Sequence, residues 1–336
     1  MPELRRDPVT QRWVAIATER AKRPHDFARQ QRVKAGGAEC PFCEGNEAMT
    51  PPEVMAYRPE GTAPNTPGWT IRVVPNLYPA FGPESGDLNE REHGLFLVMN
   101  GLGAHEVLIA TPEHVEEVGL LPAEQLTLMA KSYVDRYLAH KASPVVKYVH
   151  IIMNYGREAG ASREHPHSQL FAVPLVPSLV ETELWGAGLY HEERGRCVFC
   201  DMVKQELASG ERVVFQNERF VVFAPYASRI PFEMWIVPKE HQPNFEAIDQ
   251  QDVLAFAGAL KQALGKLAVG VNDPPFNYWI HTSPTQRPDV APFYHWHVEI
   301  LPKLAIAAGF ELGTEIMIDT VLPETAAAFL REVQAP

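Results

Sequence analysis

The stretch NYGREAGASREHPHSQ, residues 154–169, organises the rest of the chain. It begins as a loop of small and polar residues and ends in two histidines, His165 and His167, separated by one proline. Apolar residues follow at 170–173, so we expect a strand here, in which residues i and i+2 point to the same face. Two interpretations are open: both histidines bind one metal, or one binds a metal while the other attacks a substrate.

The composition of the 336-residue chain limits the classes of function. Its length allows one large domain or two ordinary ones. The formal net charge of −12 argues against long nucleic acids, whose binding depends on neutralisation of phosphates by Lys and Arg. No segment approaches the ~18 apolar residues of a membrane span, and no apolar signal-peptide core follows Met1. We therefore expect a cytoplasmic protein without a membrane or nucleic-acid partner.

All four cysteines occur in two C-x-x-C pairs, Cys40/Cys43 and Cys197/Cys200. In a reducing cytosol such pairs indicate metal binding or redox chemistry rather than a disulfide framework. A redox motif is expected as one pair at the N-terminus of a helix. Two similar pairs far apart, each with histidines downstream, fit zinc better.

The order of sequence features repeats along the chain. Each half contains a C-x-x-C pair, a strand ending in proline, a second strand, a histidine shortly after a proline (P-x-H at 112–114 and P-x-x-H at 238–241), a long helix, a third strand and an H-x-H motif. The long helices are predicted at 122–140 and 249–268, the second with Asp249 as its N-cap. We infer an internal duplication with halves at 1–180 and 190–336. The predicted fold class is α+β, with mostly antiparallel sheets and one long helix in each half.

Counting ligands shows that one histidine is left over in each half. Structural zinc usually takes four ligands from Cys and His. Each site would use a C-x-x-C pair, the histidine that follows a proline and one histidine of an H-x-H motif: Cys40, Cys43 and His114 with His165 or His167, and Cys197, Cys200 and His241 with His295 or His297. The plainer alternative is that some of these histidines only pack in the core.

A histidine held beside a closed metal site is a candidate nucleophile. Its pKa lies near neutrality, so much of it is uncharged and its free nitrogen can attack. Ligation of His165 would fix the position of His167 two residues away. The preceding loop offers donors suited to a phosphoryl group, namely the backbone N–H groups of Gly156 and Gly160 and the side chains of Ser162, Arg163 and Gln169.

The second H-x-H motif differs from the first at two informative positions. Trp296 stands in place of Pro166, and Glu299 stands in place of Gln169. A carboxylate at this position would repel a phosphate, so we expect the second copy to be structural. The basic segment 20–24 near the start of the chain is either a solvated loop or a phosphate contact.

At these residues the chain resembles the galactose-1-phosphate uridylyltransferase family, in the transferase branch of the histidine-triad superfamily. The resemblance is carried by the basic segment 20–24, CPFC at 40–43, VVPN at 73–76, PEH at 112–114, HPHSQ and the duplicated H-x-H motif. In this branch a glutamine stands where the hydrolases have a third histidine, and here that position is Gln169. The similarity extends over nearly the whole chain.

The resemblance implies nucleotidyl transfer by a ping-pong mechanism. His167 would attack the α-phosphorus of a nucleotide sugar and carry the nucleotide covalently, while Gln169 holds the phosphoryl oxygens. The family's phosphate, nucleotide and sugar contacts match Arg20, Arg23, Asn76, Asn154, Gly160, Ser162, Phe310 and Glu311. Its first zinc site matches Cys40, Cys43, His114 and His165, and we expect the second at Cys197, Cys200, His241 and His295. Family members are commonly homodimers.

Two departures bring a sister group into consideration. The enteric-type enzymes have a lysine and a glutamine that contact the sugar phosphate, at positions corresponding to Ala305 and Met317 here, and their second metal site has no C-x-x-C pair. Both features resemble the group that includes ADP-glucose phosphorylase. The leading hypothesis is UMP transfer between UDP-hexose and hexose 1-phosphate. The alternative is phosphorolysis of an ADP-sugar with inorganic phosphate as acceptor.

Overall fold

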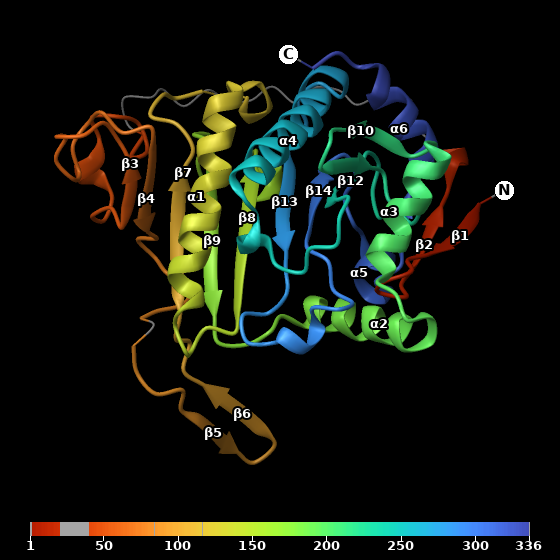
Figure 1. The fold of residues 1–336 in the computed structure, drawn as a ribbon, viewed down its shortest axis with the longest axis horizontal. Coiled ribbons are helices and arrows are strands. Elements are labelled where there is room, and N and C mark those ends of the chain that lie inside the picture. The colour runs from red at the N-terminus through yellow and green to blue at the C-terminus, as the bar shows by residue number, and fades with distance from the viewer. Residues whose placement is uncertain (1, 21–39, 84, 116, 336) are drawn as a thin grey trace.

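Strands from both halves of the chain form one ten-stranded antiparallel sheet in the computed structural model, which describes residues 2–335 except 21–39, 84 and 116. The order across the sheet is β10-β11-β12-β14-β13-β8-β9-β7-β4-β3 (Figure 1). Its strands are β3 (Met55–Tyr57), β4 (Ile71–Pro75), β7 (Ala104–Ile109), β8 (Tyr148–Tyr155), β9 (His167–Val173), β10 (Val213–Gln216), β11 (Phe220–Phe223), β12 (Met234–Pro238), β13 (Phe276–His281) and β14 (His297–Pro302).

The strand order is the same in the two halves when it is read outward from the centre. On one side β8 is followed by β9, β7 and β4, and on the other β13 is followed by β14, β12 and β11. The two central strands pair antiparallel, with Asn277 opposite Asn154. The α+β class and the antiparallel sheet predicted from the sequence are confirmed.

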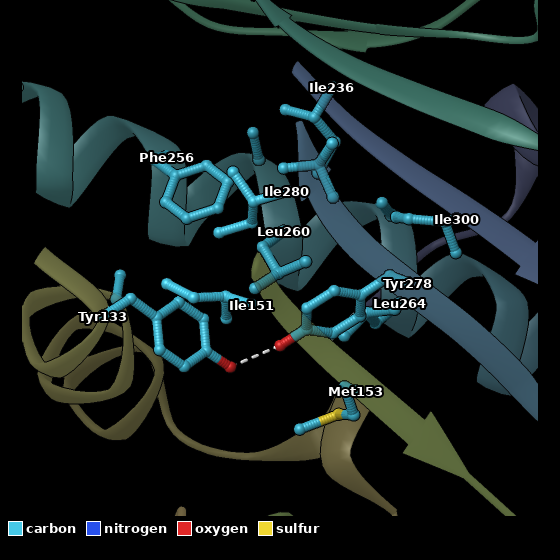
Figure 2. Packing of buried hydrophobic residues seen from close by; sticks show 14 of the residues in the cluster. Tyr133, Ile151, Met153, Ile236, Phe256, Leu260, Leu264, Tyr278, Ile280 and Ile300 are labelled. Carbon is cyan, nitrogen blue, oxygen red and sulfur yellow. Dashed lines mark hydrogen bonds between the residues drawn. The ribbon is translucent and has the colours of Figure 1, made fainter. Parts of the chain in front are cut away.

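The two long helices predicted from the sequence cover one face of the sheet. They are α1 (Ala123–Lys141) and α4 (Gln250–Gly270), and Asp249 caps α4 by accepting a hydrogen bond from the backbone N–H of Asp252. Their apolar faces pack against each other and against the central strands (Figure 2). By length and composition α4 could also cross a membrane, but 56% of its most apolar window is buried, because it is the core helix of this layer.

The opposite face of the sheet is covered differently in the two halves. Helices α2 (Ser178–Arg194) and α3 (Val198–Ser209), which the sequence analysis did not predict, pack on the strands of the second half. Their core includes Phe199, Phe223 and Trp235. On this face Gln169, Asn154 and Ile152 of the first half stay partly exposed, and they mark the candidate site.

Smaller elements flank the main sheet. A three-stranded sheet joins β1 (Glu3–Arg6), β2 (Trp13–Ile16) and β15 (Met317–Asp319), and the C-terminal region adds the helices α5 (Gly309–Thr314) and α6 (Pro323–Glu332). The segment between β4 and β7 contains a hairpin of β5 (Glu90–His93) and β6 (Phe96–Met99), which projects from the body (Figure 1). Leu95 at its tip is fully exposed.

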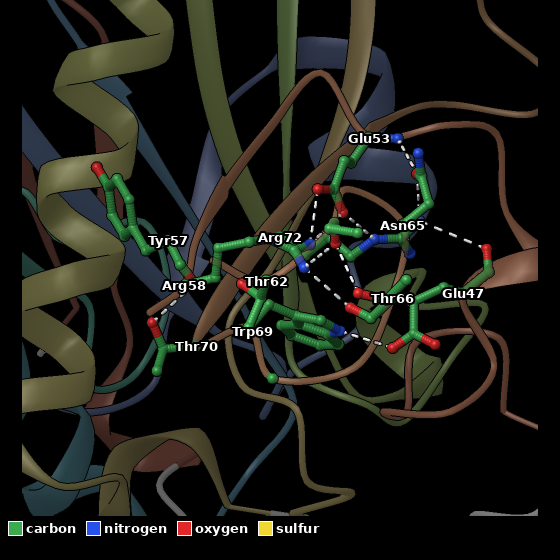
Figure 3. Close-up of polar contacts among 12 residues, drawn as sticks. Glu47, Glu53, Tyr57, Arg58, Thr62, Asn65, Thr66, Trp69, Thr70 and Arg72 are labelled. Atoms are coloured by element: carbon green, nitrogen blue, oxygen red, sulfur yellow. Dashed lines mark hydrogen bonds and ion pairs between the residues drawn. The ribbon is translucent and has the colours of Figure 1, made fainter. Parts of the chain in front are cut away.

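A polar network fixes the loop that follows the first cysteine pair (Figure 3). The buried guanidinium of Arg72 on β4 donates to Glu53 at 3.0 Å and to the Thr50 hydroxyl at 2.8 Å. Glu47 accepts from the Trp69 indole at 2.8 Å. A buried charge is stable only when it is paired in this way. The network therefore holds the loop beside the C-x-x-C turn.

Candidate active site

His167 begins β9 with one ring nitrogen bonded to the backbone and the other free. Its Nδ1 lies 2.8 Å from the carbonyl oxygen of His165, which can only accept, so Nδ1 carries the proton. The side chain is 6% exposed, and burial lowers its pKa below the ordinary value. At neutral pH the Nε2 lone pair is therefore available for nucleophilic attack.

Two amide side chains contact His105 on the neighbouring strand, and a third lies next to His167. Gln169 follows two residues later on the same face of β9, and its Oε1 lies 2.8 Å from Nε2 of His105 on β7. Asn76, at the end of β4, places its Nδ2 at 3.1 Å from the same His105 nitrogen. Because Met153 pairs with Ser168 in the β8–β9 ladder, Asn154 lies next to His167.

The loop between β8 and β9 folds tightly over this end of the strands. It contains a single 3₁₀ turn, Arg157–Ala159, flanked by Gly156 at φ 83° and Gly160 at φ 86°. These left-handed conformations favour glycine. A Cβ at Gly156 would also lie only 2.8 Å from the Cβ of Pro275. Ser162 is exposed beyond this turn, on the same loop as Gly160.

The first cluster of candidate metal ligands lies next to His167 and includes His165, two residues earlier in the chain. The ligand atoms of Cys40, Cys43, His114 and His165 all lie within 4.8 Å of one another. Nδ1 of His165 faces both thiols, at 3.7 and 3.6 Å, because its Nε2–H donates to the Thr111 carbonyl at 2.8 Å. Two thiols and two imidazoles with such an orienting hydrogen bond are the donor set of a structural zinc site.

The second half repeats this cluster with Cys197, Cys200, His241 and His295. Cys200 Sγ lies 3.2 Å from Nδ1 of His241 and 3.6 Å from Nδ1 of His295. Nε2–H of His241 donates to the Ala291 carbonyl at 2.7 Å. The neighbouring Cys197 thiol lowers the pKa of Cys200 below its ordinary value, and the two histidines act in the same direction. A thiolate beside two imidazoles suits a divalent cation.

The phenylalanine inside each C-x-F-C motif contacts the second histidine of the H-x-H motif, which is not part of the metal cluster. Ring centroids are 5.1 Å apart for Phe42 and His167, and 5.0 Å apart for Phe199 and His297. His297 also donates from Nδ1 to the carbonyl of His295, at 3.1 Å. The two copies therefore share their architecture up to the nucleophile position.

The second copy is closed by charged groups. Arg229 donates to Glu299 and to Glu233, each at 2.6 Å, so the carboxylate in place of Gln169 is held in an ion pair. Burial opposes ionisation, yet Arg229 and the nearby histidines hold the pKa of Glu299 well below its ordinary value. The ring of His297 stacks on Trp235 at 4.8 Å. This arrangement places a carboxylate where the first copy has an amide, and the guanidinium beside it is engaged by two carboxylates.

A third buried cluster in the second half was missed by the sequence analysis. It joins Glu183, His281, His297 and Glu299, all of them buried. Nδ1–H of His281 donates to Glu183 at 2.8 Å, and the Tyr294 hydroxyl donates to the other oxygen of Glu183 at 2.7 Å. Glu183 comes from α2, which was not expected, so no sequence motif linked it to the sheet.

Two of the remaining predicted contacts lie on the second half of the chain rather than beside His167. Phe310 and Glu311 lie in α5, and Glu311 lines a 310 Å³ cavity beneath the second half together with Glu183, Arg229 and Glu299. Arg23 lies outside the described residues, and Arg20 is the last residue of a 3₁₀ turn at their edge. Contacts from these four residues therefore stay predictions.

The family model described as "Galactose-1-phosphate uridyl transferase, N-terminal domain" matches residues 1–177. The chain belongs to the galactose-1-phosphate uridylyltransferase family. A second model, a domain of unknown function, matches residues 103–333. As a member of this family, the protein is a nucleotidyltransferase built on the duplicated sheet described above.

Relatives with two different activities align with almost the whole of this chain. ADP-glucose phosphorylase from Arabidopsis thaliana is 37% identical over 99% of this chain and 93% of that protein. Galactose-1-phosphate uridylyltransferase from Thermotoga maritima is 30% identical, with 99% of each chain covered. The crystal structure of the Arabidopsis enzyme with bound ADP-glucose matches with a TM-score of 0.83, at 35% identity, over 99% of this chain and 100% of that one. A uridylyltransferase structure gives a TM-score of 0.75 at 28% identity, covering 98% of each chain.

Proposed function

We propose that the protein transfers UMP between UDP-hexose and hexose 1-phosphate through a covalent nucleotidyl-histidine on His167. The observation that carries this proposal is the tautomer of His167. Its Nδ1–H is bonded to the His165 carbonyl, which leaves the Nε2 lone pair on the partly open face of the sheet. A fixed, neutral imidazole beside amide donors is suited to attack on a phosphate ester.

The reaction would proceed in two displacements at the α-phosphorus. Nε2 of His167 bonds to the α-phosphorus of UDP-glucose while the bond from that phosphorus to the bridging oxygen breaks, and glucose 1-phosphate leaves with the electron pair. A phosphate oxygen of galactose 1-phosphate then attacks the same phosphorus, the P–N bond breaks, and UDP-galactose forms. The His165 carbonyl, 2.8 Å from Nδ1, stabilises the positive charge that the ring carries in the intermediate.

Zinc fits both cysteine–histidine clusters and belongs to the proposal. Cys40, Cys43, His114 and His165 would hold one ion, and Cys197, Cys200, His241 and His295 would hold the other. All four ligand positions are filled by protein atoms, as in structural sites. The ion would supply rigidity, since it would fix the backbone from which His167 projects.

Adenylyl transfer is the second candidate function. The 37% identity to an ADP-glucose phosphorylase and the second C-x-x-C pair favour it. In that reaction His167 would take AMP from an ADP-sugar, and inorganic phosphate would accept it. The chemistry at His167 is the same in both cases, and only the base and the acceptor differ.

We also propose a homodimer in which α5 completes the site of the partner. Phe310 is 52% exposed, and Glu311 faces the cavity under the second half of its own chain. If these residues contact the sugar, they would do so at His167 of a second copy. Measuring activity against protein concentration in a mixture of His167→Ala and Phe310→Ala/Glu311→Ala subunits tests this. Recovery of activity on mixing supports shared sites, and no recovery argues against them.

The function itself is tested by assaying two substrate pairs with one preparation. UDP-glucose with galactose 1-phosphate should yield UDP-galactose, with parallel double-reciprocal lines as in a ping-pong mechanism. ADP-glucose with inorganic phosphate is the comparison. Faster turnover of the second pair would replace uridylyl by adenylyl transfer, and turnover of neither pair would overturn both candidates.

A further inference from the structure

The amide groups near His167 can help a phosphoryl group only in one of their two orientations. An amide presents N–H donors on one side and a carbonyl oxygen on the other. The donors stabilise phosphoryl oxygens, whereas the carbonyl oxygen repels them. The orientation of the Gln169 and Asn154 amides is therefore set by the groups that hydrogen-bond to their carbonyl oxygens.

Behind Gln169 stands His105, whose tautomer is set by the backbone. The Ala80 N–H donates to Nδ1 of His105 at 3.2 Å, so Nδ1 is unprotonated and Nε2 carries the hydrogen. Nε2–H then donates to Oε1 of Gln169 at 2.8 Å. The ring is held by stacking on Phe171, with centroids 4.0 Å apart, and burial keeps the pKa of His105 below its ordinary value.

The other tautomer of His105 satisfies fewer partners. It would accept from Nδ2 of Asn76 at 3.1 Å, but it would set a ring N–H against the Ala80 N–H and a lone pair against Oε1 of Gln169. The Nε2–H form therefore has two good hydrogen bonds and one donor facing the NH2 group of Asn76, whereas its alternative has one good hydrogen bond and two mismatched contacts. In that form the NH2 group of Gln169 is left for the substrate.

Behind Asn154 stands Asn277, from the second half of the chain. Nδ2 of Asn277 donates to the backbone carbonyl of Ala159 at 2.8 Å, which fixes the orientation of this amide. The same nitrogen donates to Oδ1 of Asn154, also at 2.8 Å. The carbonyl oxygen of Asn154 is thus occupied, and its NH2 group faces the Gly160 turn, 4.0 Å from where a Cβ of Gly160 would lie.

We propose that His105 and Asn277 are positioning residues, which hold the carbonyl oxygens of Gln169 and Asn154 so that both NH2 groups donate to the phosphoryl group during transfer. The inference rests on the proposed role of His167. It extends that role to two residues that no sequence motif marks. It also gives the second half of the chain a part in the site, because Asn277 lies on β13.

The test uses amide variants that place a donor at one imidazole nitrogen or the other. His105→Gln keeps a donor near the position of Nε2, whereas His105→Asn places its donor near Nδ1, against the Ala80 N–H. Asn277→Asp keeps the shape of the side chain but places a carboxylate oxygen against the Ala159 carbonyl and Oδ1 of Asn154, which are both acceptors. The Asn154 amide must then rotate, which turns its carbonyl oxygen toward the substrate. The measurement is the single-turnover rate of nucleotidylation with UDP-glucose and with ADP-glucose, with substrate affinity, zinc content and melting temperature recorded in parallel.

We expect His105→Asn and Asn277→Asp to slow the single-turnover rate by about 100-fold each, the loss typical of one transition-state donor. His105→Gln should stay within about tenfold of the wild type, since a donor remains at that position. A merely structural role would instead move the melting temperature and zinc content of all three variants together. If the wild type is nucleotidylated and His105→Asn and Asn277→Asp react at its rate, the positioning roles are wrong while the proposed function stands. If the wild type is not nucleotidylated with either substrate, the proposed function fails and this inference fails with it.

Discussion

The ring of Phe42 lies 5.1 Å from the imidazole of His167, and Phe42 is flanked in sequence by Pro41 and the metal-cluster residue Cys43. The turn that would bind the first zinc ion therefore also supports the candidate nucleophile. The second half has the same relationship between Phe199 and His297 at 5.0 Å. The two copies thus differ beyond this support, at Gln169 and Glu299, and we assign the proposed chemistry to the copy with Gln169.

Loss of the first metal cluster should abolish activity, and loss of the second should mainly reduce stability. Cys43→Ser removes a ligand behind His167, so the nucleophile loses its fixed position. Cys200→Ser is the matched change in the inert copy. We expect metal analysis to fall from two zinc ions per chain to one in each variant, while turnover is lost only in Cys43→Ser. Equal activity of the two variants would contradict the assignment of the first half as the active copy.

Truncation of the supporting ring should separate chemistry from stability. Phe42→Ala leaves the metal ligands intact but frees the His167 ring, and we expect a fall in kcat of about tenfold, roughly 1.4 kcal/mol of barrier. Phe199→Ala creates a cavity at a fully buried position and should cost about 3–5 kcal/mol of unfolding free energy. The checks are steady-state kinetics and urea denaturation. A Phe199→Ala variant that lost kcat without losing stability would contradict the assignment of a catalytic role to Phe42 and a structural role to Phe199.

The ion pairs of Arg229 should be essential to the inert copy. Arg229→Met leaves the carboxylates of Glu233 and Glu299 buried without their cation, which should cost about 3–5 kcal/mol in denaturant unfolding. Adding Glu233→Gln and Glu299→Gln removes both charges and should restore most of that stability. If the triple variant is no more stable than Arg229→Met, the loss comes from packing and the charge argument does not hold.

His150 should make the fold less stable in acid. Burial and the neighbouring His281 lower its folded pKa to about 3, against an ordinary value of 6.5. Between these values the unfolded chain binds more protons than the folded chain, so stability falls as pH decreases from 6.5 toward 3, by at most about 1.4 kcal/mol per pH unit.

The control for this effect is His150→Phe, which removes the titrating group. Urea denaturation at pH 7 and pH 5 should give a smaller loss of stability for the variant than for the wild type. Release of zinc in acid affects both proteins, so the comparison isolates His150. An identical loss in both would show that another group is responsible.

Local sequence patterns predicted the parts of the molecule that they determine. The apolar spacing of residues 122–140 and 249–268 agrees with α1 and α4, because each helix buries one continuous face. The repeated C-x-x-C and H-x-H motifs predicted which side chains the structure brings together in two clusters. In these cases the sequence pattern and the structure that it predicts lie within the same short segments of the chain.

The rest depends on contacts between distant segments. Glu183 reaches His281 only because α2 packs on the second half of the sheet, and α2 has too few apolar residues in a regular spacing to be recognised. His105 and Asn277 look like ordinary strand residues until β7 and β13 are placed beside β9 and β8. Their role follows from hydrogen-bond geometry, which one sequence does not contain.

The most direct test of the central claim is the intact mass of the protein after incubation with UDP-glucose or with ADP-glucose, in the absence of an acceptor. The account predicts a gain of one nucleotidyl group, which is lost in His167→Ala and kept in His297→Ala. The substrate that gives the faster gain identifies the base. A wild-type protein that gains no mass with either substrate, or a His167→Ala variant that gains it normally, would contradict the account.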